Sequence, residues 1–200
     1  MLVRLTVTRP WTYQHILVAG AAALAGAASF VAAPDMRGAM GAALALLMTA
    51  IAVIDARSFI IPNELNAAGL ALALLHAGVQ NPQVVLEALS LALLRGAFVA
   101  LIFLALRVGY RLLRGREGIG LGDVKLAGVA GAWLDPLIVA LVIENAAVMA
   151  LATYLVRQQA LGRSIRPVNR LPFGLFFAPS IWLGWFLQTT WLAPLQTLFE

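Results

Sequence analysis

The sequence predicts an all-α membrane protein, a polytopic bundle of about seven transmembrane helices. Of the 200 residues, 62% are hydrophobic and 12% are charged, whereas an ordinary soluble domain is about half apolar and one-quarter charged. The apolar residues come in blocks long enough for helical spans, without the alternation that marks the strands of a β-barrel. These observations indicate one membrane-embedded bundle, which we expect to form a single domain over residues 1–200.

Each apolar block is a candidate span. The second ends at Asp55, the third follows Pro62-Asn63, and an acid such as Glu64 suits the N-terminus of a helix. The fifth block holds about 12 residues, or ~18 Å of helix against a hydrocarbon core of ~30 Å. It therefore either begins below the membrane surface or joins the sixth through Asp135-Pro136, so six spans are the alternative count. The blocks are residues 15–33, 38–54, 64–79, 84–106, 123–134, 136–156 and 171–194.

The basic residues predict the orientation of the bundle. If the N-terminus is cytoplasmic, twelve of the fourteen Lys and Arg residues fall on the cytoplasmic side. Arg37 alone falls on the other side, and Arg95 lies within a span. This distribution follows the positive-inside rule. The first span, with SFVAAPD after it, also resembles a cleavable signal peptide, and cleavage there would leave the remaining topology unchanged.

Most of the polar residues have a plain interpretation. We interpret Asp35, Asp135 and Glu200 at predicted outer ends, and Glu117 in a basic loop, as solvated charges. Polar groups inside spans usually face the bundle interior and pair there, so we expect structural pairing for them, with a direct functional role as the alternative. These intramembrane residues are Glu87, Arg95, Glu144 and Asn145, of which the first two share a face of the fourth span.

Two acidic residues stand apart because they lie at the cytoplasmic ends of different predicted helices. Asp55 ends the second span in AVIDARSFIIPNELN, and Asp123 opens the fifth in GIGLGDVKLAG. Pro62 lacks an N–H, so the chain after Asp55 must leave the helix. The glycines at 118, 120 and 122 let the backbone bend and approach a neighbour closely. A helix-end role is the plainer interpretation for either acid alone, but the surroundings of both indicate a shared site.

A pair of carboxyl groups is what aspartic proteolysis requires. Two close carboxyl groups share a proton, because it is unfavourable for both to be ionised at the same time. The ionised member can deprotonate a water while the protonated member donates to the scissile carbonyl oxygen. This chemistry needs no cofactor or metal, and the sequence has no cysteine and two histidines. Lys125 can bias the pair, although a lysine reaching for the membrane surface is the plainer interpretation.

These motifs resemble the type IV prepilin peptidase family, the GxGD-type aspartic proteases of the bacterial inner membrane. Asp55 with IPN at 61–63 is similar to the family's first motif, an Asp followed seven residues later by Pro. GLGDVKL at 120–126 resembles the second, and RLPFG at 170–174 resembles a third element near the last span. The resemblance covers residues from about 38 to 185 and implies that Asp55 and Asp123 are catalytic. The residues it implies as support for the site are Pro62, Asn63, Gly120, Gly122, Lys125, Pro172 and Gly174.

The resemblance implies a multi-pass inner-membrane endopeptidase that cuts the basic leader from type IV pilin-like precursors at the cytoplasmic face. Its partners would be the prepilin and membrane lipids, with no nucleic acid, and the basic loops at 107–116 and 157–170 would bind anionic headgroups. Longer family members carry a zinc-binding insert with paired CxxC motifs and also methylate the new N-terminus. This sequence has no cysteine and about 14 residues before the first span. It therefore resembles the short peptidases of tight-adherence (Flp) pilus systems, and we expect no methyltransferase activity.

Two functions from other classes are the alternatives. A small proton-coupled transporter or channel would use Glu87, Arg95 and Glu144 as a polar relay, and a membrane assembly factor would need no catalytic pair. A GxGD protease of the presenilin and signal-peptide-peptidase group is disfavoured, because no Pro-Ala-Leu motif lies near the C-terminus. Substitution of Asp55 and Asp123 distinguishes these hypotheses, since only a protease requires both acids for its activity.

Overall fold

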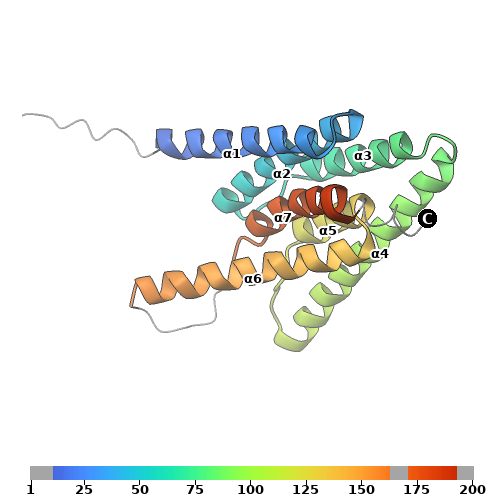
Figure 1. Cartoon of the computed structure of the whole chain (residues 1–200). Coiled ribbons are helices and arrows are strands. Elements are labelled where there is room, and N and C mark those ends of the chain that lie inside the picture. Colours follow the sequence, from blue (N-terminus) through green and yellow to red (C-terminus); the bar gives the residue numbers. More distant parts are fainter. Residues whose placement is uncertain (1–10, 163–170, 193–200) are drawn as a thin grey trace, which may run out of the picture.

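The computed structural model describes residues 11–162 and 171–192, which form an all-helical bundle (Figure 1). The all-α prediction is confirmed, and each of the seven predicted segments corresponds to one α-helix of the described chain. The fourth helix runs further than expected and includes most of the arginine-rich segment after residue 106. The elements are α1 (Trp11–Ala32), α2 (Met36–Ser58), α3 (Asn63–Gln80), α4 (Val85–Arg114), α5 (Leu121–Trp133), α6 (Pro136–Ala160), α7 (Gly174–Leu187) and the π-helical turn η1 (Gln188–Leu192).

Four of the described helices are long and apolar enough to cross a membrane by themselves: α1, α2, α4 and α6. The other three are shorter or more polar. α5 and α7 have 13 and 14 residues, or about 20 Å of helix each at 1.5 Å per residue. The expectation that the fifth segment is too short for the full hydrocarbon core is therefore confirmed.

Local signals set the ends of the helices. Asp35 begins α2, where its side chain accepts a hydrogen bond from the backbone N–H of Arg37 at 2.8 Å, as preferred N-cap residues do. Phe59 ends α2 in the left-handed conformation at φ 56°. Gly115 ends α4 in the same conformation, where a glycine carries no steric cost.

α5 and α6 are separate helices joined by a tight turn. Leu134 and Asp135 are both extended, and Pro136 occupies the first turn of α6, the position in which proline is best tolerated. The alternative of one bent unit through Asp135-Pro136 is therefore wrong, and the two helices make few contacts with each other.

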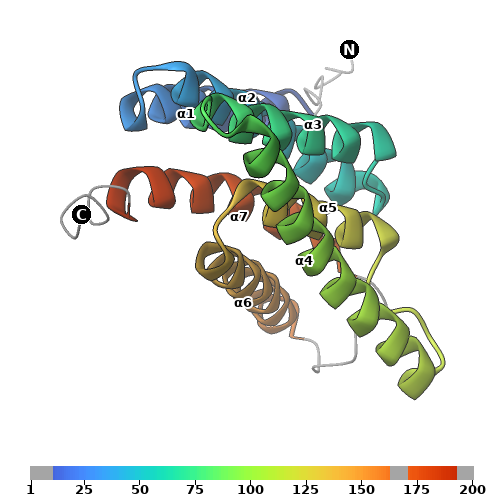
Figure 2. The same cartoon turned by 90° about the vertical axis from the view of Figure 1, so that its right-hand side faces the viewer.

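The helices pack in layers, with α5 and α7 in the middle (Figures 1 and 2). α1 lies against α2 on one side, and α2 and α3 cover α7 and α5. α4 packs against α5, and α6 packs against α7, on the other side. The two shortest helices are thus surrounded by longer ones, which is why they need not reach both membrane surfaces alone.

Small residues allow the close approach of α4 and α5. A Cβ added at Gly96 would lie 2.7 Å from the carbonyl oxygen of Gly128, and one at Gly131 would lie 2.8 Å from the carbonyl oxygen of Arg95. Such contacts are typical of membrane helices, in which small residues let backbones pack tightly. α5 therefore sits deep in the bundle, and most of its residues are buried.

The packing of α2 on α7 depends on a glycine. A Cβ at Gly41 would lie 1.9 Å from the ring of the buried Trp185. We expect Gly41→Ala to lower the stability by about 1–3 kcal/mol, as overpacking typically does. Thermal unfolding of the detergent-solubilised chain measures this. Gly20→Ala is the matched control, because nothing lies within 4 Å of that position, and an equal fall in both variants would contradict the packing argument.

The charged residues pair differently from the sequence-based interpretation. Arg95 binds Asp135, with 3.0 Å between Nη1 and Oδ1, because the turn between α5 and α6 lies beside Arg95. Glu87, on the same helix as Arg95, is exposed in the first turn of α4. Asp135 and Glu117 are therefore not plain solvated charges, since Glu117 binds Arg107 at 2.5 Å. The expected pairing of Asn145 is confirmed, because its Nδ2 donates to Ser180 Oγ at 2.8 Å.

Candidate active site

Asp55 is a buried carboxylate in the last turn of α2. Its side chain is 4% exposed. One oxygen, Oδ2, accepts a hydrogen bond of 3.0 Å from the backbone N–H of Leu175 in the first turn of α7. A helix N-terminus presents free N–H groups and a partial positive charge, both of which suit a carboxylate. α7 therefore orients the side chain of Asp55.

Asp123 lies in the first turn of α5 and is partly buried. Its Oδ2 accepts a hydrogen bond of 3.2 Å from the backbone N–H of Gly120, the residue that precedes the helix. This is the reciprocal half of a capping box, in which the third helical residue reaches back to the cap. The glycine-rich segment before Asp123 thus holds the carboxyl group at the end of its helix.

Ile61 joins the surroundings of the two acids. This buried residue contacts Gly122, where an added Cβ would lie 2.9 Å from Ile61 Cβ. It also contacts Gly174, where an added Cβ would lie 2.8 Å from Ile61 Cδ1 and 2.9 Å from Asp55 Oδ2. The neighbours of Asp123 and Asp55 therefore meet on one side chain, although the acids are 68 positions apart in the chain.

The two carboxyl groups also interact electrostatically, since the charge of Asp55 acts on Asp123. Like charges that act on each other in a partly buried setting disfavour simultaneous ionisation. The structure thus brings together the two acids that the sequence analysis singled out, and both lie at the end of the bundle where α2 finishes and α5 begins.

The loop before Asp123 is anchored to α4. The guanidinium of Arg107 donates to the carbonyl oxygen of Ile119 and binds Glu117. Gly118 lies against the ring of Tyr110, where an added Cβ would be 2.6 Å from Cδ1. These contacts fix the glycine-rich segment from two sides, so Asp123 is held in position although three glycines precede it.

Pro62, Asn63 and Lys125 lie where α3 meets α5. Pro62 precedes α3, and Asn63 is its first residue. Lys125 Nζ donates to Asn63 Oδ1 at 2.5 Å, so the lysine ties the starts of the two helices together. The interpretation of Lys125 as a residue that only reaches for the membrane surface therefore misses this contact. Gly122 contributes its carbonyl oxygen, which accepts from Asn66 Nδ2 at 3.5 Å.

The Pro-Phe-Gly element lies beside Asp55. Gly174 is buried in the first turn of α7 and contacts the carboxyl group, while Arg170 falls outside the described residues. Pro172 lines a largely apolar cavity of about 380 Å³ between the ends of α2 and α6 and the start of α7. Leu175, whose N–H binds Asp55, lies in the same wall, with Phe59 and Arg157 at other points of the lining. The cavity thus adjoins the acid.

Three features of the site were not predicted from the sequence. The N–H of Leu175 as the partner of Asp55 depends on how α7 docks, which no local pattern reveals. The left-handed Phe59 and the bridging Ile61 lie in the FII segment after Asp55, and three apolar residues at a helix end are a weak signal. In the described part of the chain, no three His, Asp or Glu side chains gather as metal ligands.

Comparison with known proteins defines the class to which this fold and site belong. The model of the Type IV leader peptidase family matches residues 42–155, which include both acids. Leader peptidase HopD of Escherichia coli is 33% identical over 132 residues, 66% of this chain and 82% of that protein. The chain belongs to the Type IV leader peptidase family, whose members are aspartic proteases of the bacterial inner membrane.

Longer proteins are also similar to this chain. The prepilin leader peptidase/N-methyltransferase of Burkholderia pseudomallei is 38% identical over 164 residues, 81% of this chain. That of Dichelobacter nodosus is 31% identical over 147 residues, 72% of this chain. This chain spans 48% of the length of each of these two relatives. No solved structure matches the chain at a significant level.

Proposed function

We propose that Asp55 and Asp123 are the catalytic pair of an endopeptidase that removes the basic leader from type IV pilin-like precursors. The observation that carries this proposal is that the surroundings of the two acids meet on Ile61 at one end of the bundle, where the charge of Asp55 acts on Asp123. The names of the longer relatives, which include prepilin leader peptidases, support the substrate class.

The proposed chemistry uses one water and one shared proton. The ionised acid removes a proton from the water, whose oxygen forms a bond to the scissile carbonyl carbon. The protonated acid donates to the carbonyl oxygen, so that a neutral tetrahedral intermediate forms. As the intermediate collapses, the acid that gave its proton takes one back from a hydroxyl group of the intermediate. The C–N bond breaks, and the proton taken from the water passes to the leaving nitrogen. The N–H groups of Leu175 and Gly120 orient the two acids.

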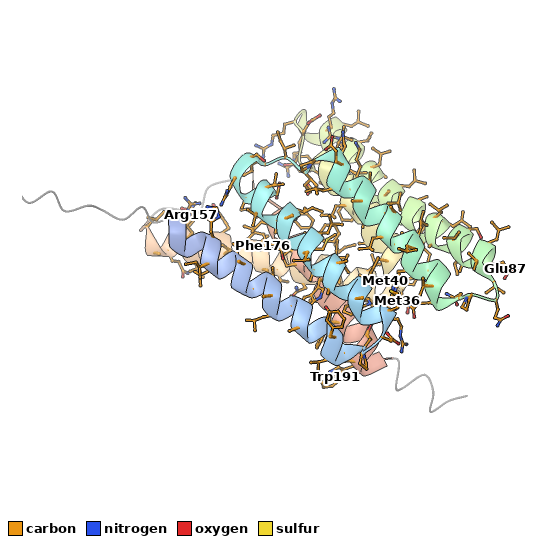
Figure 3. The ribbon with its side chains drawn as sticks, turned by 90° about the horizontal axis from the view of Figure 1, so that it is seen from above. Met36, Met40, Glu87, Arg157, Phe176 and Trp191 are labelled. Carbon is orange, nitrogen blue, oxygen red and sulfur yellow. The ribbon has the colours of Figure 1, made fainter. Side chains whose placement is uncertain are left out.

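The position of the pair supports cleavage at the cytoplasmic face. Arg57 and Arg157 lie in the last turns of α2 and α6, and Arg157 lies at the end of the bundle opposite Met36 and Glu87 (Figure 3). Asp55 shares the last turn of α2 with Arg57. The positive-inside rule assigns this basic end to the cytoplasm. A precursor helix in the bilayer would present its cytoplasmic end at the level of both acids.

The shared proton predicts a bell-shaped pH profile. At low pH both acids are protonated and neither can act as the base; at high pH both are ionised and neither can donate. We therefore expect the initial rate of leader removal to fall on both sides of an optimum. The measurement is cleavage of purified prepilin across the pH range in which the enzyme stays folded. A flat profile over several pH units would contradict a pair that shares one proton.

The 200 residues contain no cysteine, which supports the likeness to the Flp-type peptidases. It also supports the prediction that this chain does not methylate the processed pilin. Mass spectrometry of the pilin N-terminus, after processing by this protein as the sole peptidase, tests it. We expect the mass of the unmodified amine. An added methyl group of about 14 Da would contradict the prediction.

The transporter alternative lacks structural support. A relay would need Glu87, Arg95 and Glu144 within reach of one another. Arg95 instead binds Asp135, while Glu87 and Glu144 are exposed on different helices. Glu87 lies in the first turn of α4, at the end of the bundle opposite Arg157 (Figure 3).

A further inference from the structure

Glu144 is an ionisable residue on the outer surface of a membrane-spanning helix. It lies in α6, eight residues from Pro136, or about 12 Å along the helix, and its side chain is exposed. Charged and acidic side chains in spans almost always face the bundle interior or a partner, because lipid offers them no hydrogen bond. The neighbouring Asn145 follows that rule by donating to Ser180. Glu144 has no such partner among residues 11–162 and 171–192, so its surroundings in the described chain are incomplete.

The residues around Glu144 form a regular seam. Leu137, Leu141, Val148 and Leu151 are each more than half exposed, and with Glu144 they follow spacings of four, three, four and three. This is the heptad pattern of a helix that packs along a partner helix. The opposite face of α6, which includes Val142 and Ala146, is buried in the bundle. The seam therefore points away from α7 and from the two acids of the candidate active site.

We propose that α6 pairs with α6 of a second copy of this chain along this seam, with the two Glu144 side chains facing each other. All copies insert into the membrane in the same orientation, so a two-fold axis along the membrane normal places identical residues at the same depth. A carboxyl group in its acid form both donates and accepts hydrogen bonds, so Glu144 of each copy can satisfy the other.

The observations favour a second copy over another occupant. A lipid chain could cover the leucines but would leave the carboxyl group without a partner. A substrate helix would need a polar group at the same depth, and it would have to bind on a face directed away from Asp55 and Asp123. A single polar residue in a heptad seam commonly fixes the register of paired helices, and the central place of Glu144 fits that role.

Cysteine cross-linking tests the proposal, because the native chain has no cysteine. Val148→Cys is placed in the full-length protein in bacterial membranes and oxidised with a membrane-permeant reagent. We expect a disulfide-linked dimer on a non-reducing gel. The matched control is Leu101→Cys, which lies on α4 and is 61% exposed, against 57% for Val148. Equal dimer yields from the two positions would overturn the proposal.

A second substitution tests the role of the carboxyl group. In the Val148→Cys background, Glu144→Gln should retain the dimer because the amide also donates and accepts. Glu144→Leu should lower the yield by about tenfold, since leucines alone give little drive for association in lipid. An undiminished dimer in the leucine variant would contradict the proposal. So would a disulfide formed with a cysteine-bearing, co-expressed prepilin in place of a second copy.

Discussion

Replacing Asp123 with Asn, or Asp55 with Asn, is expected to abolish leader removal while the protein still accumulates in the membrane. Asn is nearly the same size as Asp, and its amide oxygen can still accept from the backbone N–H of Gly120 or Leu175. It cannot take or give the proton that each step requires. Loss of an acid–base group costs roughly 10²–10⁴-fold in rate, which a gel-shift assay of a co-expressed prepilin would register as no visible cleavage.

The control for this series is Glu64→Gln. Glu64 is an exposed acid in the first turn of α3, close in sequence to the first motif but outside the contacts that join the two acids. We expect this variant to cleave as the native chain does. Normal cleavage by either Asn variant would remove that acid from the catalytic pair. Equal losses in the Glu64 variant would indicate a general effect of charge at this surface.

The second large effect is expected from Gly174→Ala. The added Cβ would lie 2.9 Å from Asp55 Oδ2 and 3.0 Å from Asp55 Cγ, with Ile61 Cδ1 at 2.8 Å. The flexible end of Ile61 can move aside, but a displaced carboxyl group loses the N–H of Leu175. A misplacement near 1 Å can cost on the order of 10²-fold in rate. We therefore expect a fall of that size in kcat, with a smaller change in KM.

Gly109→Ala is the matched control for the glycine series, because nothing lies within 4 Å of that position in α4. It should leave both the rate and the thermal stability of the protein close to native values. If Gly174→Ala cleaves at the native rate, the contact between Gly174 and the carboxyl group does not position Asp55. If it unfolds, the residue supports the fold and its effect on rate carries no information about the site.

The order of helices was predictable because the physical signals are local. The apolar blocks, Pro62 before α3 and Pro136 at the start of α6 act within a few residues. Their effect does not depend on what the helices later contact. The end of α4 was less predictable, because Leu112 and Leu113 continue a helical pattern through the arginines up to Gly115.

Both acids of the candidate site could also be singled out from the sequence, since each combines a helix end with unusual backbone residues. Their partners could not. These contacts join residues 40 to 120 positions apart in the chain, so they depend on how the helices dock. They are the hydrogen bond from Leu175, the contacts of Ile61 and the salt bridge of Arg95 with Asp135. The expected structural pairing of Arg95 is found, but its partner Asp135 could not be predicted. Spacing along the sequence identifies neighbours on one helix and gives no information about the turn that follows another helix.

The most direct test of the account is the proximity of the two acids in the membrane. In the cysteine-free chain, Asp55→Cys with Asp123→Cys is treated with a short, reducible cross-linker, and a protease site in the exposed turn at 81–84 is then cleaved. We predict that the two fragments stay joined until reduction. In the paired control, Asp55→Cys with Asp135→Cys, they should separate, because Asp135 lies at the other end of α5. Separation of the fragments in the first variant would contradict a shared active site.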